Sequence, residues 1–466
     1  MSKSRSELIF EHALKFATPF RTTLGQSWAI IPDGSGRYHG WPIASRNFAR
    51  WMAHSFHHEH SIFPGGYALN NAVRMFDAHA RHSEFPVSDI FTRIGWRGDR
   101  RIPQSVLLHL ANTNHELVEI TAHGNRIVAA ESWHFLDGPS TLPLPRPIAS
   151  DVTLHDHLRA LFNIDGIALE RAIVWLFAAL RPSGPYPILV LSGPPASGKS
   201  MLARMLRHLI DPSATPLLEP PTTEPRLFTM ALHNHVLAFD DVDGLPRAIA
   251  RAIARLAGGT GLAICGRNMF DEPQPLPLAR PIITTTTAGL PACFSTNQIR
   301  VQLNAIDSEN VQTETAHAQK HRAAAPAILG TLCAAVTAAL SNATANKTAP
   351  VSRFADVHQW TMAAAPILGL TPQQINRALS ANPLVDAVDG LLQTQSEWTG
   401  TASDLLKNLR TIGFSAATDA RHLSVQLNAT PLALFGIALE KSSTHDKHLI
   451  HLRRQSTEIS LRTAAL

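Results

Sequence analysis

The sequence predicts an α/β core with a parallel sheet, preceded by an α+β domain and followed by a helical lid and a small C-terminal domain. Three observations carry this prediction. An apolar run over residues 187–192 leads into a glycine-rich loop and then an amphipathic helix. A second apolar run, residues 235–239, ends in two carboxylates, and strand, loop and helix alternate up to about residue 306. This alternation is typical of a parallel sheet with covering helices.

The glycine-rich loop has the phosphate-binding form G-x-x-x-x-G-K-S. Gly193 and Gly198 let the backbone curl so that its N–H groups face phosphate oxygens, Lys199 adds a charge, and Ser200 offers a hydroxyl to Mg²⁺. A helix predicted over residues 201–210 adds its positive N-terminal end. We therefore expect ATP and Mg²⁺ as cofactors, with the nucleotide bound by Gly193, Pro194, Pro195, Ala196, Ser197, Gly198, Lys199, Ser200 and Met201.

The second apolar run is followed by Asp240 and Asp241, the form of a Walker B strand. A carboxylate at the end of a central strand can reach the metal, and the next can orient or deprotonate the attacking water. We predict that Asp240 and Ser200 serve the metal, and that Asp241 serves the water. Alone, the run Asp-Asp-Val-Asp-Gly would indicate an ordinary capped turn; the phosphate loop favours the metal site.

A third strand, residues 280–287, has the position of the sensor strand in ring ATPases. Thr284 or Thr285 could contact the γ-phosphate or the water there, and we predict Thr285 as a catalytic residue. Threonine is also an ordinary strand residue, which leaves a structural role open. The glycine-rich segment 256–274 has hairpin character; in ring translocases an insertion here projects into the pore, where Arg267 and Asn268 would meet a nucleic-acid backbone.

Residues 1–148 are predicted to form the α+β domain. Helical patterns near residues 45–58 and 68–82 precede alternating segments near 89–94, 105–110, 117–121 and 126–130, separated by turn signals. These segments predict an antiparallel sheet. Residues 137–147 contain four prolines, which fit neither a helix nor a central strand, so we predict a linker.

The core is expected over residues 149–311, with helical residues 154–180 before the phosphate loop, and the lid over residues 312–383. The lid begins with an alanine-rich helical stretch, residues 315–340, predicted to be kinked or divided at Pro326. Helical patterns at residues 357–368 and 372–380 complete it.

Residues 384–466 are predicted to form a winged-helix domain. A helix over residues 401–409, a helical pair within 419–439 and two strands within 439–452 have its order. One helix of such a domain enters a groove and the basic wing contacts phosphate, although winged helices also dock proteins. The candidate contacts are Arg421, His422, Gln426, Lys441, Lys447 and Arg453.

Composition sets outer limits. With 466 residues, of which 45% are apolar, the chain should form several globular domains. No apolar run reaches the ~18 residues of a membrane span and the N-terminus lacks a signal peptide's apolar centre, so we expect a cytoplasmic protein. Three widely spaced cysteines indicate neither disulfides nor a cysteine zinc site. A net charge of +5 permits a polyanionic partner, and the basic cluster of Arg93, Arg97, Arg100 and Arg101 is a solvated face or a nucleic-acid contact.

A histidine-rich segment, residues 54–60, also attracts attention. His54 and His58 would share one helical face, as zinc ligands require. Glu59 does not occupy the position of a metalloprotease base, and no third ligand follows in the sequence. A solvated, partly capping histidine run is the favoured interpretation.

Over roughly residues 30–455 the chain resembles the helicase-like ATPases of bacteriophages and integrated mobile elements, which are related to superfamily 3 and AAA+ helicases and often joined to primases. The resemblance implies an AAA+-like P-loop core, ATP-driven remodelling or unwinding of DNA, a ring oligomer and a C-terminal winged helix. Besides the phosphate loop, its carriers are residues 142–145, 175–193, 211–214, 236–240, 244–246, 266–267, 280–283 and 398–406.

Two departures from the family pattern matter. The family has Arg-Pro-Val-Ile-Leu-Asn-Gly where this chain continues from Arg280 into three threonines, so Thr285 replaces the sensor asparagine. The family has Asp-Arg before the next strand, whereas this chain has Thr296 and Asn297. Losing an arginine that acts on a neighbour's nucleotide costs about 10³-fold or more in turnover. Arg300 and Arg267 are the candidates to substitute for it.

Together these features predict an ATPase that acts as an ATP-dependent DNA helicase or translocase in the replication of a phage or mobile element. Its expected partners are single-stranded or forked DNA, further copies of the chain in a ring that could be a hexamer, and a primase or other replication protein. Two alternatives stay open. One is a nucleotide-gated DNA-binding helicase loader or initiator with weak ATPase activity, and the other is a nucleotide-stabilised protein adaptor.

Overall fold

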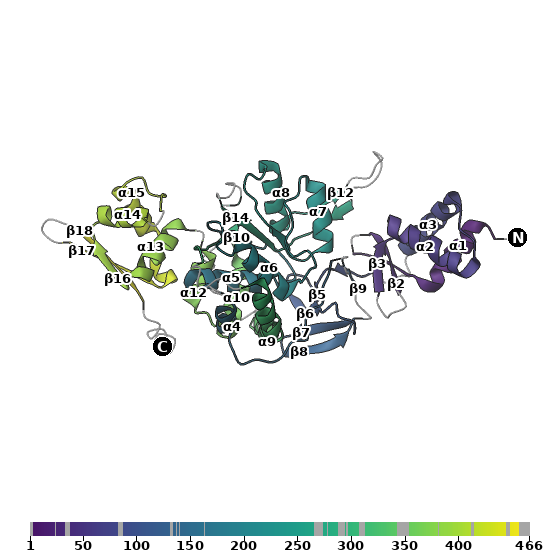
Figure 1. Cartoon of the computed structure of the whole chain (residues 1–466), viewed down its shortest axis with the longest axis horizontal. Helices are drawn as coiled ribbons and strands as arrows, with labels where there is room; N and C mark the ends of the chain where they lie inside the picture. The colour runs from purple at the N-terminus through teal and green to yellow at the C-terminus, as the bar shows by residue number, and fades with distance from the viewer. Residues whose placement is uncertain are drawn as a thin grey trace.

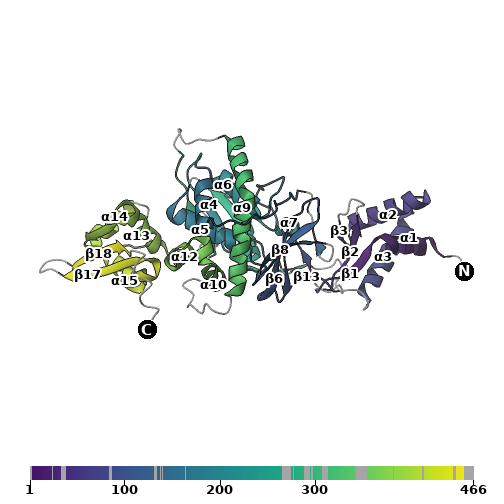
Figure 2. The same cartoon turned by 90° about the horizontal axis from the view of Figure 1, so that it is seen from below.

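Three bodies follow one another along the longest axis of the molecule (Figure 1). The first described helix and the last described strand lie at opposite ends in both views (Figures 1 and 2). The computed structural model describes residues 3–23, 25–32, 38–82, 87–130, 134–136, 138, 140–162, 164–264, 274–276, 278–287, 294, 297–306, 313–342, 354–380, 382–411, 414–443 and 448–455.

The N-terminal body packs three helices on a small antiparallel sheet. The helices are α1 (Arg5–Phe16), α2 (Arg46–His60) and α3 (Gly66–Arg81), and the strands are β1 (Thr18–Arg21), β2 (Ser27–Pro32) and β3 (Tyr38–Pro42), in the order β1-β2-β3. Ile9, Phe48 and Phe76 are fully buried in their shared core. Helices α2 and α3 confirm the two predicted helices. Helix α1 was not predicted because one of its three buried side chains is His12, which weakens the apolar periodicity.

A four-stranded antiparallel sheet follows, as predicted, in the order β5-β6-β7-β8. Its strands are β5 (Ile94–Gly98), β6 (Pro103–His109), β7 (Glu116–Thr121) and β8 (Gly124–Ala129), and a short parallel pair, β4 (Ile90–Phe91) and β9 (His134–Phe135), lies beside it. Val106, Leu108 and Val118 belong to the same apolar cluster as the helices around the phosphate-loop strand. The expected boundary near residue 148 therefore cuts through one core, and the apolar cores separate earlier, between α3 and β4.

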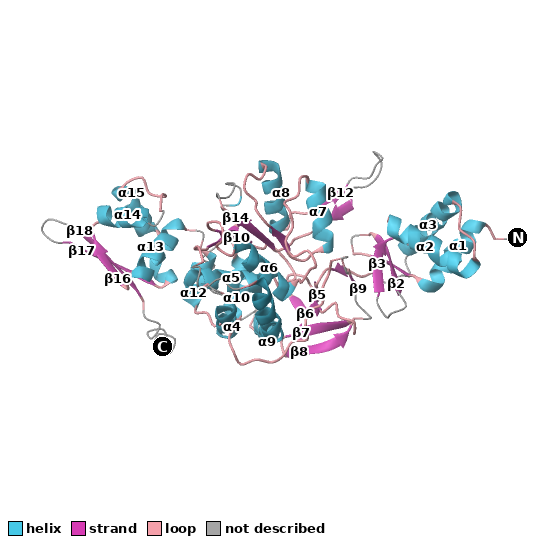
Figure 3. Ribbon diagram, in the orientation of Figure 1, coloured by secondary structure: helices cyan, strands magenta, loops and turns pink. Residues whose placement is uncertain are grey.

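The central body contains a four-stranded parallel sheet in the order β11-β14-β10-β15. Alternate residues of β10 face opposite sides: Leu189 and Leu191 join one apolar cluster, and Ile188 and Val190 join another. Helices cover both faces (Figure 3), so the fold class is the mixed α/β class with a parallel sheet. The elements are β10 (Ile188–Ser192), β11 (Leu237–Phe239), β14 (Ile282–Thr286), β15 (Gln298–Gln302), α4 (Leu154–Leu161), α5 (Gly166–Ala178), α6 (Lys199–Ile210), α7 (Glu224–His233) and α8 (Arg247–Gly258).

The proline-rich segment before α4 has no helix or strand in its described part, as predicted, but it is a packed strap and not a loose linker. The Leu144 N–H donates to the Leu110 carbonyl at 2.8 Å, and the Ile148 N–H donates to the Pro326 carbonyl at 3.0 Å. A Cβ added at Gly330 would lie only 1.8 Å from the Ile148 carbonyl oxygen. The strap therefore crosses the long helix α9 at a position that admits only glycine.

Helix α9 (Glu314–Ser341) is one continuous helix with Pro326 inside it. Of the two expectations at Pro326, a kink or a division, the division is therefore wrong. It has the length and mean hydropathy, 1.9, of a membrane span, so the expectation that no apolar run is this long is wrong for this helix. Half of that window is buried, against α4, α6 and the antiparallel sheet, as expected for a core helix (Figure 2). The helices that follow confirm the predicted pattern: α10 (Ala355–Ala363), α11 (Ala365–Leu368) and α12 (Pro372–Leu379).

The C-terminal body has its own apolar core around Trp398, Leu405 and Leu423. Its three-stranded sheet has the order β16-β18-β17, and the predicted hairpin is confirmed as β17 and β18. The expectation of a second helix after the first of the pair is wrong, because only a 3₁₀ turn separates α15 from β17. The elements are α13 (Pro383–Thr394), β16 (Glu397–Gly400), α14 (Ala402–Thr411), α15 (Ala420–Ala429), η3 (Leu432–Phe435), β17 (Ile437–Ser443) and β18 (His448–Arg454).

A chain of buried charges joins the central and C-terminal bodies. Arg377 on α12 donates from Nε to Glu170 on α5 at 3.0 Å and from a terminal nitrogen to Asp389 on α13 at 2.8 Å. Arg454 on β18 also reaches Asp389 at 2.8 Å. Glu170 and Asp389 are both nearly inaccessible to solvent. Paired charges of this kind hold α5, α12 and α13 in one arrangement, since each would be costly to bury alone.

Candidate functional site

The phosphate loop lies between β10 and α6 in the predicted place. A Cβ at Gly193 would come 2.4 Å from the Leu303 carbonyl oxygen, and Gly198 has φ of 82° in the left-handed region. Both positions therefore favour glycine for geometric reasons. Pro194, Pro195 and Ala196 are exposed, whereas Ser197 is buried.

The N-terminus of α6 has the features of an anion site. Gly198 is its N-cap, so no side chain caps the first N–H groups of the helix. The Lys199 ammonium lies across the loop and donates to the Gly193 carbonyl at 2.9 Å and the Pro194 carbonyl at 2.8 Å. Uncapped N–H groups and an adjacent ammonium suit a phosphate. Met201, in the first turn, packs on the central core instead.

Two oxygen donors meet at the carboxyl edge of the sheet. The Ser200 hydroxyl donates to Asp240 Oδ1 at 2.9 Å, which joins the phosphate-loop helix to the end of β11. Hydroxyl and carboxylate oxygens are the ligands that Mg²⁺ prefers. Both residues are only partly exposed, and their donor set fits the predicted metal.

Thr285 belongs to the same group, although its contacts differ from those expected of a sensor. Strand β14 lies between β10 and β11, and the Thr285 hydroxyl donates to Asp240 Oδ1 at 2.5 Å. The Thr285 hydroxyl oxygen also accepts the Asp241 N–H at 2.8 Å. Thr284 faces the other side of the strand, where its hydroxyl donates to the Leu189 carbonyl at 3.4 Å. Of the two threonines, only Thr285 contacts the acidic turn, which carries Asp240 and Asp241. Its hydroxyl positions this turn.

Asp241 stands in the left-handed region with φ of 53°. Aspartate tolerates this conformation better than most residues, and backbone strain of this kind is concentrated at functional sites. The residue is exposed, and its N–H is held by Thr285. Its role toward the attacking water stays a prediction.

Asp243 caps the same turn. Its carboxylate accepts the Thr287 N–H at 3.0 Å and the hydroxyls of Thr286 and Thr287. This residue was not among the predicted site residues. The signal was present in the run Asp-Asp-Val-Asp-Gly, which matched both a Walker B strand and a capped turn. The structure contains the capped turn, since Asp243 ties it to β14, and Asp240 lies beside Ser200 of the phosphate loop.

Asp211 holds the residues that lead into β11. One of its oxygens accepts the N–H groups of His235 at 2.9 Å and Val236 at 3.0 Å, and the other pairs with Arg93 at 3.0 Å. Burial raises the pKa of Asp211, but Arg93 and Arg207 outweigh it and hold the pKa below its usual value. Arg93 is 2% exposed, so the interpretation of the basic cluster as a solvated face or nucleic-acid contact is wrong for this member.

Of the two candidates for a trans-acting arginine, Arg300 lies within the described part of the chain. Arg300 lies on β15, where its Nε donates to Ser192 Oγ of the same chain at 3.0 Å. Arg267 and Asn268 lie outside the described residues. The hairpin that leads to them is present as β12 (Leu262–Ile264) paired with β13 (Gln274–Leu276).

The other nucleic-acid candidates lie on the C-terminal body, far along the molecule from β10 (Figure 1). Arg421 is exposed on α15, whereas Gln426 donates to the Ala416 carbonyl at 2.9 Å, which indicates a structural role. Lys441 donates to Asn428, and Arg453 pairs with Glu440 at 3.0 Å. Lys447 lies outside the described residues. The fold does not bring these side chains to the nucleotide site.

Residues 155–359 match the family described as the actinomycete integrative conjugative element replication protein. This match runs from α4 into α10 and includes Ser200, Asp240 and Thr285. A comparison with curated proteins finds no match.

Solved structures similar to the chain include the apo A form of the C-terminal region of NrS-1, with 10% identity, a TM-score of 0.41 and coverage of 97% of this chain and 100% of that one. Another is the SCCmec type IV Cch, described as an active helicase, with 12% identity, a TM-score of 0.40 and 94% of each chain covered. A third is the JCV helicase with a bound thiazolopyridine compound, with 13% identity, a TM-score of 0.24 and coverage of 48% and 69%.

Proposed function

We propose that the chain is an ATP-hydrolysing DNA helicase or translocase that replicates an integrated or phage-type mobile element. The observation that carries the proposal is the meeting of Ser200 and Thr285 on one oxygen of Asp240, beside a phosphate loop. The match of this segment to a replication-protein family supports the biological setting. The protein would act in the cytoplasm on single-stranded or forked DNA, with a primase or another replication protein as a partner.

In this proposal the first N–H groups of α6 and the Lys199 ammonium bind the β- and γ-phosphates of ATP. Ser200 and Asp240 would hold Mg²⁺, which neutralises charge that develops on the phosphates. Asp241 orients the attacking water and accepts its proton. Thr285 keeps Asp240 and Asp241 in place through its two hydrogen bonds.

The remaining bodies receive roles in the same proposal. Helices α9 to α12 act as a lid, and α9 is at the same time part of the central core. The C-terminal body acts as a winged helix, with α15 and the β17–β18 hairpin toward DNA. The β12–β13 hairpin leads to Arg267 and Asn268 at the pore of a ring, which could be a hexamer.

One observation favours a second function. Arg300, a candidate for the trans-acting charge, is engaged with Ser192 of its own chain. Without such an arginine, turnover should be slower by about 10³-fold or more. A DNA-binding loader or initiator with weak, nucleotide-gated activity is then the alternative, and a nucleotide-stabilised adaptor is the third.

The test measures ATP turnover by the full chain with and without single-stranded DNA, together with its mass in solution with ATP. Strong stimulation by DNA in a ring oligomer is the expected result. Tight nucleotide binding with feeble turnover would support the loader, and indifference to DNA would support the adaptor. A folded protein with no affinity for any nucleoside triphosphate would overturn all three.

A further inference from the structure

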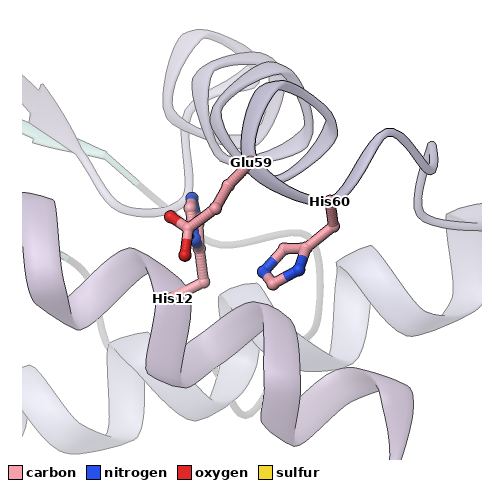
Figure 4. A group of neighbouring side chains, drawn as sticks. All are labelled: His12, Glu59 and His60. Atoms are coloured by element: carbon pink, nitrogen blue, oxygen red, sulfur yellow. The ribbon is translucent and has the colours of Figure 1, made fainter.

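The N-terminal body brings together three side chains that the proposed nucleotide chemistry does not use. His12 of α1 and Glu59 and His60 from the C-terminal end of α2 point toward one another (Figure 4). One ligand atom from each lies within 4.8 Å of the other two. Helix α2 alone offered no third ligand to His54 and His58. The structure supplies a different set, in which the histidine from α1 completes the group.

His12 is buried, with 2% of its surface exposed, and its two ring nitrogens have different surroundings. Nε2 lies 2.8 Å from the Ser55 hydroxyl, within hydrogen-bond distance. Nδ1 lies 3.0 Å from Glu59 Oε2, yet it has no partner with hydrogen-bond geometry. The carboxylate oxygen is therefore beside Nδ1 but off the line along which an N–H would donate.

This arrangement suits a shared cation. When Nε2–H donates to Ser55, Nδ1 keeps its lone pair, and an unshared lone pair next to a carboxylate is repulsive. A cation between them removes the repulsion. Histidine ligands of metals commonly donate their second ring N–H to a neighbouring oxygen, which fixes the tautomer and the ring orientation. Ser55 is placed for that role.

We propose that His12, Glu59 and His60 form a binding site for a zinc-like divalent cation that joins α1 to the end of α2. Two imidazoles and one carboxylate are a donor set typical of zinc, and a fourth position would remain for water. In a tetrahedral zinc site neighbouring ligand atoms lie about 3.3 Å apart. Glu59 and His60 are exposed, so rotation of these two side chains brings the ligand atoms from within 4.8 Å of one another to this tetrahedral spacing.

The neighbours of the cluster leave the ligand atoms accessible. Lys15 pairs with Oε1 of Glu59 at 3.4 Å, which leaves Oε2 toward His12. The His60 ring lies beside Phe56, with ring centroids 4.4 Å apart, and so is held near His12. A bound cation would add a further link between two helices that are joined by apolar packing, the His12–Ser55 contact and the Lys15–Glu59 ion pair.

The test is a competition titration of Zn²⁺ between a chromophoric chelator and the full-length chain. We expect the wild type to bind one Zn²⁺ ion tightly that neither Glu59→Gln nor His60→Ala binds tightly. Both substituted side chains are exposed. His54→Ala and His58→Ala, on the same helix but outside the cluster, should keep that ion. Ser55→Ala should weaken it by about 10- to 100-fold. Equal zinc binding by the wild type, Glu59→Gln and His60→Ala would overturn the proposal.

A second readout separates the site from nonspecific binding to other histidines. Zn²⁺ should raise the melting temperature of the wild type and of His54→Ala, but not of His60→Ala, because a ligand that binds only the folded state stabilises it. An equal rise in His60→Ala would contradict the site. Nucleotide affinity should be the same in all these variants, so failure here leaves the proposed ATPase untouched.

Discussion

The hydroxyl of Thr285 donates a 2.5 Å hydrogen bond to Oδ1 of Asp240, the same oxygen that Ser200 approaches from the phosphate loop. Because its oxygen also accepts the Asp241 N–H, Thr285 holds both acidic residues at once. At this position the family that the chain resembles has an asparagine. This chain uses the Thr285 hydroxyl there, and the hydroxyl positions the acidic turn. The predictions below test this arrangement and the architecture around it.

Replacing Thr285 by valine removes the hydroxyl while keeping the shape of the side chain. Each hydrogen bond to a charged group contributes about 1.5–3 kcal/mol, so turnover should fall about 10- to 100-fold while nucleotide affinity changes little. Thr285→Ser should restore most of the activity, because serine keeps the hydroxyl. Equal rates for the valine and serine variants in a steady-state ATPase assay would remove the positioning role.

Lys199→Ala should abolish nucleotide binding or turnover. The ammonium at the mouth of the loop is the charge that would meet the β- and γ-phosphates, and alanine offers no substitute. Equilibrium binding of a fluorescent ATP analogue measures the effect. Lys3→Ala, which alters an exposed lysine paired with Glu11 on the N-terminal body, is the matched control and should bind normally.

Asp241→Asn should spare nucleotide binding and stop hydrolysis. An amide keeps the size of the side chain but cannot accept the proton of the attacking water. Binding and single-turnover hydrolysis should be measured on the same preparation. Unchanged hydrolysis would show that Asp241 has no part in the chemistry.

Stability should fall on acidification, because His235 is buried. Burial lowers the pKa of His235 to about 4, below the unfolded value of about 6.5. Between these values the unfolded chain binds more protons, so stability is complete above about pH 6.5 and is lost as the pH falls toward 4. At about 1.4 kcal/mol for each pKa unit, the loss from His235 is about 3 kcal/mol.

Burial also lowers the pKa of His109 to about 3 and that of His208 to about 4, so both act in the same direction. Denaturant unfolding from pH 4.5 to 7.5 measures the total slope. His235→Gln should reduce that slope, since glutamine does not titrate in this range. The same slope in the variant would assign the acid sensitivity to other groups.

Arg377→Met should destabilise the protein by about 3–5 kcal/mol, because it leaves Glu170 and Asp389 buried without their shared partner. Thermal unfolding measures the loss. Arg421→Met, at an exposed position on α15, is the control and should change stability little. A variant as stable as the wild type would show that Glu170 and Asp389 find other compensation.

Much of the nucleotide site could be predicted because its signals are local. The phosphate loop, the apolar strand before it and the paired carboxylates after β11 are contiguous runs that can be identified without knowledge of the fold. Thr285 was placed correctly as the polar residue on the central strand. Its actual contacts could not be predicted, because they depend on the register of β14 between β10 and β11.

Longer-range features gave the errors. The proline-rich strap before α4 contacts α9 across a long stretch of sequence, since the Ile148 N–H donates to the Pro326 carbonyl. The burial of Arg93 depends on Asp211, which lies far along the chain. No local pattern contains such information. His12 likewise had no partner within α1 that would indicate a metal ligand.

The sequence by itself determined the phosphate loop, the alternation that builds a parallel sheet, and those helices and strands whose apolar periodicity is regular. It could do so because the hydrogen bonds of a turn and apolar periodicity are set by near neighbours in the chain. Only the tertiary structure decided which apolar core each sheet joins, which charges are paired, and that His12 meets Glu59 and His60. Burial and pairing are properties of surfaces brought together by packing, and the residues on the two sides of such a surface are separated in the chain.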